Sequence, residues 1–262
     1  MRGSVGLVML LALAVALPCA AMPYTLSPDE DAVVRQMDPT LNYGAAGALA
    51  VGGTAATNSD GVVQGRMDSF MRFSTAAFVA AMDAQFGAGA WVVESAVLTL
   101  NEQRKPNNPM YSQGAGQFSI LWLSQDSADN WVEGTGKPNS PKTNGISFSD
   151  EVAMLSASDL GLGTFSSNGP VGTPDFVDVV CDLALPSAFV GDLTAGGYVT
   201  LFLAPADDTI GFQFGARENL TESSRPYLVL TAEAAPVIPE PGTAALVVLG
   251  ILAGLRRRRA RA

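Results

Sequence analysis

The feature that most limits the possible folds is a series of short apolar segments in the last third of the chain, separated by turn-forming residues. Segments of four to eight residues that are rich in β-branched and aromatic side chains and bounded by Gly, Pro, Asn or Asp are typical of β-strands. Four such segments are predicted as strands, at residues 176–181, 198–203, 210–214 and 227–231. This part of the chain is therefore expected to fold as β-structure.

The earlier part of the chain continues the same pattern and adds one helix. Strands are predicted at residues 32–36, 48–52, 69–73, 92–100 and 117–123. A helix is predicted over residues 75–84, with Ser74 as its cap and Gly87 and Gly89 after its end. Residues 187–191 fit a single helical turn, residues 149–160 are ambiguous, and residues 53–65 and 161–174 are predicted as loops. Residues 126–150 form a long polar connection.

Eight to ten short strands with long connections and one helix indicate an all-β fold, a single jelly-roll-like β-sandwich. No change in composition marks an internal boundary, so one domain is expected from residue 24 to residue 233, followed by a linker at residues 234–238.

The N-terminal residues 1–21 have the pattern of a secretory signal peptide. Arg2 precedes an apolar segment at residues 5–17, and the small residues Ala20 and Ala21 follow, so cleavage is expected near Ala21. Cys19 raises the alternative of a lipoprotein, but Pro18 stands where a small residue would be needed.

The C-terminal residues 239–262 combine a turn, an apolar run and a basic end. The turn is Pro239, Glu240 and Pro241, the apolar run covers residues 243–255, and the arginines are Arg256, Arg257, Arg258, Arg259 and Arg261. The run is shorter than the roughly 20 residues that span a bilayer. The arginines predict that the preceding chain lies outside the cytoplasm. This order resembles the PEP-CTERM sorting signal, which implies a transient helix in the inner membrane and cleavage by an exosortase-type protease. The alternative is an ordinary tail anchor.

Charge and missing residue types exclude several functions. Nine Lys and Arg and twenty-four Asp and Glu lie between residues 24 and 238, a net charge of −15 for the expected mature chain. Phosphate backbones bind to basic patches, so a nucleic-acid partner is not expected. The chain contains no histidine, which removes Ser-His-Asp and Cys-His catalysis. Only Cys181 remains outside the signal, so no intramolecular disulfide is possible, and Cys181 is expected in the core.

Five segments, taken in order, resemble the DNRLRE domain, an extracellular β-sandwich module related to the family-96 carbohydrate-binding modules. They are Asp31-Ala-Val-Val with Asn42-Tyr43-Gly44 and Leu49-Ala-Val-Gly52, Phe70-Met-Arg-Phe73, Ser95-Ala-Val-Leu-Thr-Leu100, Trp131-Val-Glu-Gly-Thr-Gly136, and Phe214-Gly-Ala-Arg-Glu218 running to Leu230. The resemblance implies a jelly-roll sandwich in a surface-exposed, often sugar-associated family.

Candidate sugar-binding residues are aromatic side chains in polar or turn contexts, because such rings stack on the apolar C–H face of a sugar while carboxylates and amides bind its hydroxyls. Tyr43, Tyr111 and Trp131 fit this description, with Glu133 beside Trp131. A structural role is the alternative for Trp131, with Glu133 accepting from loop amides. The other two tryptophans, Trp91 and Trp122, adjoin strands and are expected in the core.

Acidic residues before the first predicted strand and between two late strands offer oxygen ligands for calcium. The candidates are Asp29, Asp31 and Asp208, with solvated turn carboxylates as the alternative. Two carboxylates can also hydrolyse glycosides without histidine, and Asp126, Asp129 and Glu133 lie close in the sequence.

The sequence therefore predicts an exported, non-catalytic protein of the cell surface or extracellular matrix that associates with polysaccharide, with a structural calcium ion as a further expectation. The alternatives are a purely structural or adhesive module without a soluble ligand, and a secreted glycan-active enzyme.

Overall fold

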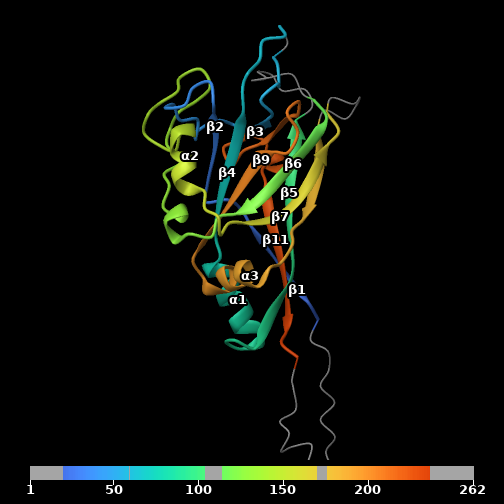
Figure 1. Ribbon diagram of the computed structural model, residues 1–262. Coiled ribbons are helices and arrows are strands. Elements are labelled where there is room, and N and C mark those ends of the chain that lie inside the picture. The colour runs from blue at the N-terminus through green and yellow to red at the C-terminus, as the bar shows by residue number, and fades with distance from the viewer. Residues whose placement is uncertain (1–19, 59, 104–113, 170–175, 237–262) are drawn as a thin grey trace, which may run out of the picture.

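The computed structural model describes residues 20–58, 60–103, 114–169 and 176–236. Within them, eleven strands form one antiparallel sheet that curls on itself (Figure 1). The strands are β1 (Met22–Leu26), β2 (Glu30–Arg35), β3 (Ala48–Gly52), β4 (Met67–Ser74), β5 (Trp91–Gln103), β6 (Gly116–Trp122), β7 (Leu160–Ser167), β8 (Phe176–Asp182), β9 (Tyr198–Pro205), β10 (Gly211–Gly215) and β11 (Tyr227–Ala234). The helices are α1 (Ala76–Phe86), α2 (Phe148–Met154) and α3 (Ser187–Ala195), with 3-10 turns at η1 (Asp126–Asp129) and η2 (Glu222–Ser224).

The hydrogen-bonded order of the strands is β1-β11-β5-β10-β3-β4-β9-β6-β7, with β2 paired to β4 and β8 paired to β5. The backbone N–H of Ala184, just after β8, donates to the carbonyl of Leu162 in β7 at 2.8 Å. The edge strand β7 therefore approaches the chain that follows β8 at this point. The larger core cluster joins buried side chains from facing parts of the sheet, among them Phe73, Phe118 and Phe214.

A smaller core cluster lies on the outer face of β2, β4 and β9, and it positions the candidate site. Alternate residues of β4 serve the two cores: Met71 and Phe73 join the larger cluster, whereas Phe70 joins the smaller one. The chain between β6 and β7, which includes η1 and α2, covers this outer face and supplies Trp131 and Ile146 to it (Figure 1). As a result every residue of β4 except Ser74 is buried.

The predictions of a mostly β fold and of a helix near residues 75–84 are confirmed. The prediction of Ser74 as the helix cap was wrong, because Ser74 ends β4 and Thr75 is the N-cap residue. The predicted helical turn at residues 187–191 is the start of α3. The three side chains expected in the core, Trp91, Trp122 and Cys181, are 8%, 5% and 0% exposed.

Residues 161–167 were wrongly predicted as loop, because Gly161 and Gly163 resemble turn residues, and with Leu160 from the ambiguous segment they form a strand. In β7 the side chain of Leu162 is buried. The strand pairs with β6, and the register between the two strands shifts next to Ile120. Gly163 has φ +154°, and a Cβ at this position would lie 2.6 Å from the ring of Phe165. The glycine therefore accommodates an irregular strand instead of ending it.

The expectation of a single helix was also wrong, since α2 forms within the ambiguous segment. Its start is fixed by a capping box in which Ser147 and Asp150 bond each other's side chain and backbone. The strand β1 was missed because Pro23 lies within it. Proline is tolerated there because β1 pairs on one side only, with β11.

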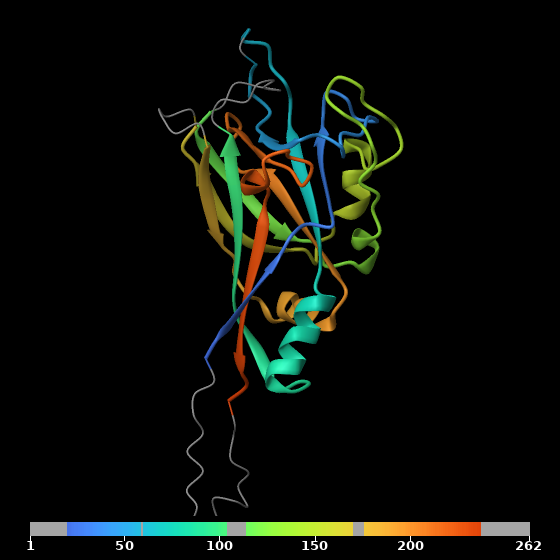
Figure 2. The ribbon, with the colours of Figure 1, turned by 180° about the vertical axis from the view of Figure 1, so that it is seen from behind.

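The described chain enters and leaves the fold at the same end. Met22 of β1 pairs with Ala232 of β11, and the reverse view in Figure 2 shows these two strands running together toward that end. The helices α1 and α3 pack near it (Figure 1). Within the part of the chain that the structure describes, no helix has the length and apolar character needed to cross a membrane.

Candidate functional site

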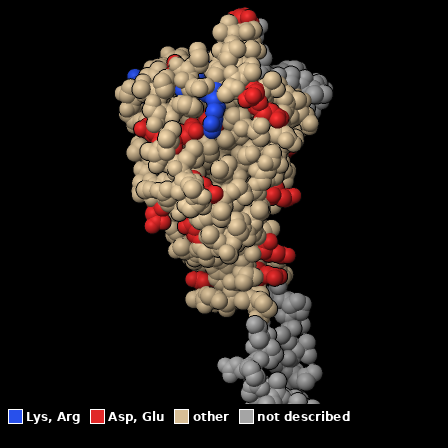
Figure 3. Space-filling view, in the orientation of Figure 1, with Lys and Arg blue, Asp and Glu red and all other residues tan. Residues whose placement is uncertain are grey.

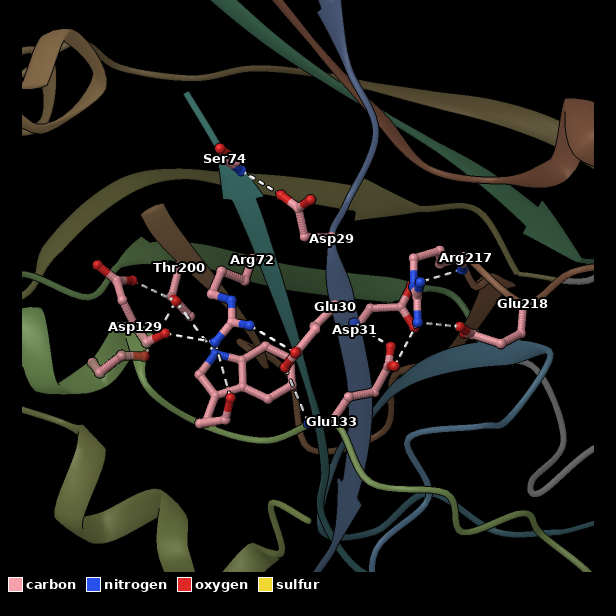
Figure 4. Close-up of polar contacts among 12 residues, drawn as sticks. Asp29, Glu30, Asp31, Arg72, Ser74, Asp129, Glu133, Thr200, Arg217 and Glu218 are labelled. Atoms are coloured by element: carbon pink, nitrogen blue, oxygen red, sulfur yellow. Dashed lines mark hydrogen bonds and ion pairs between the residues drawn. The ribbon is translucent and has the colours of Figure 1, made fainter. Parts of the chain in front are cut away.

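Arg72 organises the polar contacts on the outer face of β4. Its Nη1 donates to the backbone carbonyls of Asp129 and Trp131 at 2.6 and 2.9 Å, and its Nη2 pairs with Glu30 at 2.7 Å (Figure 4). The guanidinium carbon also lies 5.4 Å from the Trp131 ring centroid. Since Arg72 is only 9% exposed, these contacts fix the segment that carries Trp131 against the sheet.

Asn42 connects two of the segments that resemble the DNRLRE domain, its own and the one that begins at Trp131. Its Nδ2 donates to the carbonyls of Glu133 and Ile146 at 2.6 and 2.8 Å, and its Oδ1 accepts from the amide of Gly136 at 3.1 Å. Gly134 has φ +77°, and a Cβ there would lie 2.3 Å from Asn42 Oδ1. Glycine is therefore required where the loop passes over Asn42.

Three carboxylates converge beside Arg217, at the start of β2. One carboxylate oxygen from each of Asp31, Glu133 and Glu218 lies within 4.8 Å of the others. The Arg217 Nη2 pairs with Glu133 at 2.5 Å and with Glu218 at 2.7 Å, as Figure 4 shows. Asp31 Oδ2 accepts from the backbone N–H of Arg217, and the Asp31 N–H donates to Glu133 Oε1.

Burial sets the electrostatics of these carboxylates. Loss of hydration raises the pKa of Asp31 well above its usual range, and the N–H of Arg217 opposes this only in part. Burial likewise raises the pKa of Glu133. Nearer Arg72, burial raises the pKa of Asp129 to about 6, against the hydrogen bond from Thr200 Oγ1.

A separate pair of acidic residues lies between α2 and β4. Asp68 of β4 and Glu151 of α2 share Arg66, which contacts them at 2.8 and 3.2 Å. The Asp68 side chain is fully buried and that of Glu151 is 5% exposed. Burial, and then the charge of Glu151, raise the pKa of Asp68 to about 8.

Two of the three aromatic residues predicted to stack on sugars are buried and form hydrogen bonds to other side chains of the protein. Tyr43 is 2% exposed, donates its hydroxyl to Asp38 Oδ2 at 2.7 Å and lies under the Arg35 guanidinium. Trp131 is 8% exposed and donates Nε1 to Thr200 Oγ1 at 3.3 Å. Tyr111 lies outside the described residues. Glu133 accepts a hydrogen bond from a backbone amide, as expected under the alternative of a structural role.

The predicted calcium ligands are not brought together. Asp29 accepts from the backbone N–H of Ser74 at 2.6 Å (Figure 4), and Asp208 accepts from the Thr54 hydroxyl at 2.9 Å. Only Asp31 belongs to a group of converging carboxylates within the described ranges, and its partners there are Glu133 and Glu218. The sorting-signal residues Pro239, Glu240, Pro241 and Arg256 to Arg259 lie outside the described residues.

A surface pocket of about 440 Å³ opens next to Trp131, between η1, the following loop and α2. Its apolar lining comes from Trp131, Val132, Ile146, Ala153 and Met154. Its polar lining comes from Ser127, Asn130, Asn144 and Asp150. The pocket therefore combines one aromatic side chain with amide, hydroxyl and carboxylate groups, although little of the Trp131 surface is accessible.

The face of the molecule seen in Figure 3 carries acidic side chains at many places and only a few basic ones. This agrees with the acidic composition of the expected mature chain.

Sequence reasoning missed Asn42, Arg72 and Arg217 as organising residues. All three lie in segments quoted for the DNRLRE resemblance, but nothing in a single sequence marks which side chain of a motif is buried. An arginine within an otherwise apolar strand, as at Arg72 between Met71 and Phe73, was the one available signal.

No protein-family model matches this chain, and no curated protein matches it either. The resemblances to the DNRLRE domain and to the PEP-CTERM signal therefore rest on the sequence motifs alone.

Proposed function

We propose that the protein is an exported, non-catalytic module of the cell surface or extracellular matrix that associates with polysaccharide. In this proposal the curled sheet is a jelly-roll-like β-sandwich of the DNRLRE type, and residues 239–262 are a PEP-CTERM signal that an exosortase-type protease removes. The observation that carries the polysaccharide association is the pocket beside Trp131, which places an aromatic side chain among amide and hydroxyl groups. Sugar sites combine these groups because one face of a sugar ring is apolar and its edge carries hydroxyls.

The experiment on association uses the mature protein recovered from the culture medium or cell surface. It is mixed with insoluble polysaccharides, such as cellulose, chitin, mannan and cross-linked pectate, and the fraction removed by centrifugation is measured. Retention by at least one of them at 0.15 M salt is expected. Retention by none would favour the structural or adhesive alternative, which the inward contacts of Tyr43 and Trp131 also support.

The experiment on export is intact-mass measurement of the same material. The expected mass lacks residues 1–21 and also Arg256 to Arg261. A mature protein that retains these arginines would contradict removal of the tail and would indicate that the tail is a permanent anchor.

The enzyme alternative has its own test, because Asp129 and Glu133 were candidates for glycoside hydrolysis. Asp129 accepts from Thr200, and Glu133 pairs with Arg217. No release of reducing sugar from the retained polysaccharide is expected. Release that disappears in Glu133→Gln would overturn the non-catalytic assignment.

A structural calcium ion is proposed at Asp31, Glu133 and Glu218 in place of the predicted set Asp29, Asp31 and Asp208. Asp31 Oδ1 is buried without a hydrogen-bond partner among the described residues, which supports a cation there. Arg217 already neutralises part of this charge, so any calcium affinity is expected to be modest.

A further inference from the structure

The pocket beside Trp131 has a rigid apolar floor. Trp131, Ile146 and Met154 all pack into the smaller core cluster. Trp131 is held from inside by Thr200 and by the Arg72 guanidinium. An aromatic side chain that is already fixed loses little conformational entropy when a ligand contacts it, which favours binding. The volume of the pocket, about 440 Å³, lies within the range of small-molecule sites.

The rim of the pocket offers mainly hydrogen-bond acceptors. Asn130 uses Nδ2 to donate to the carbonyl of Asp126 at 3.0 Å. Asp150 uses Oδ2 to accept from Ser147. Within the described part of the chain, no hydrogen bond engages the remaining oxygens, Asn130 Oδ1 and Asp150 Oδ1. Both oxygens can therefore accept from ligand hydroxyls.

The charge of the lining selects against anionic ligands. Among the residues that the structure describes, no lysine or arginine lines this pocket, and the Asp150 carboxylate is its only ionisable side chain. The surrounding domain is also strongly acidic. A uronate, sulfate or phosphate group would meet like charge and no basic partner, whereas an uncharged hydroxylated ring would meet acceptors and an apolar floor.

We propose that this pocket binds one uncharged sugar residue of a neutral polysaccharide, with α2 as one of its walls. This inference rests on the proposed polysaccharide association and narrows it to one ligand class and one place. Trp131 supplies contact through the part of its ring that lines the pocket, and Asn130 and Asp150 accept from sugar hydroxyls.

Two adjacent residues of α2 provide a matched pair of variants. Ala153 is exposed and lines the pocket, whereas Val152 is 79% exposed and is not part of the lining. Consecutive helical residues point about 100° apart, so Ala153→Trp fills the pocket and Val152→Trp adds the same bulk outside it. Neither side chain is buried, so both variants are expected to keep the wild-type melting temperature.

Isothermal titration calorimetry of the mature protein at 0.15 M salt tests the proposal with hexasaccharides of cellulose, mannan and chitin, and with those of galacturonan and mannuronan. Binding of at least one neutral hexasaccharide and of neither acidic one is expected. Ala153→Trp should weaken that binding at least tenfold, and Val152→Trp should leave it within twofold.

Each other outcome overturns a different statement. Binding that Ala153→Trp leaves unchanged would place the sugar elsewhere, with the proposed function intact. Binding of the acidic hexasaccharides would refute the uncharged ligand class. Binding of none of the five, together with no retention on the insoluble polysaccharides, would remove the proposed function itself.

Discussion

Replacing Asp68 by asparagine should change how stability depends on pH. Asp68 and Glu151 are buried against each other, and among the described residues Arg66 alone forms ion pairs with them, so the pair is expected to retain one proton near neutrality. In the unfolded chain an aspartate releases its proton near pH 4. In the folded protein the pKa of Asp68 is raised to about 8. Between these values folding takes up a proton, so wild-type stability falls as pH rises from about 4 to about 8.

The size of the effect follows from the same values. Each pH unit inside this window corresponds to about 1.4 kcal/mol, so two units, from pH 5.5 to pH 7.5, correspond to at most about 3 kcal/mol. Asparagine has nearly the same shape and no charge to protonate, and its amide can still meet Arg66 and Glu151. The free energy of unfolding of Asp68→Asn relative to wild type should therefore rise by about 1–3 kcal/mol between these pH values. For a chain of this size, this is a relative gain of roughly 2–4 °C in Tm for each kcal/mol.

The assay is thermal and urea unfolding of both proteins at half-unit steps from pH 5 to pH 9. Glu94→Gln serves as control, because it removes one charge from an exposed position of β5 and should give a curve parallel to wild type. If the Asp68→Asn curve is also parallel to wild type across this range, Asp68 is already ionised in the folded protein and the reasoning fails.

Three further predictions concern other parts of the molecule. Glu133→Ala should lower the free energy of unfolding in urea by about 2 kcal/mol, because it removes the acceptor of the Asp31 N–H and a partner of Arg217. Glu222→Ala, at an 85% exposed side chain, should change it by less than about 0.5 kcal/mol, and equal losses would contradict the assigned role of Glu133. Burial raises the pKa of Cys181 to about 12, so iodoacetamide at pH 8 should label the mature protein only after unfolding, and rapid native labelling would show that the core opens. Millimolar Ca²⁺ should raise Tm if the proposed ion binds the folded state alone; this rise should be absent in Asp31→Asn, and an unchanged wild-type Tm would remove the ion.

The strand pattern was predictable because most strands are short apolar segments bounded by turn residues, and where a strand buries one face, alternation is visible as well. The segment 92–100 shows this in Ala96, Leu98 and Leu100, all buried in the larger core. Prediction failed where a strand pairs on one side or carries unusual residues, as in β1 with Pro23 and β7 with its glycines. In such strands local propensity opposes the structure, and the neighbouring strand determines the outcome.

The candidate site was less predictable, because its geometry depends on contacts between distant segments. Asp31 and Glu133 are 102 residues apart, and Asn42 contacts Ile146 across 104 residues. No local pattern reports such a distance. Trp131 was singled out from its polar neighbours, but its burial follows from Arg72 in β4 and Thr200 in β9, which are distant in the sequence.

The pairing of β1 with β11 determines how the fold responds to a mechanical load. As long as residues 239–262 are still attached, any pull on them passes into the fold through the C-terminal end of β11. This strand has hydrogen-bonded neighbours on both sides, five residues of β1 and eight of β5 in register. Antiparallel hydrogen bonds lie perpendicular to the strands, so a pull along β11 loads two rows of bonds in shear instead of peeling an edge strand one bond at a time. The short strand β1 thus adds a second row of hydrogen bonds that resists a pull along β11.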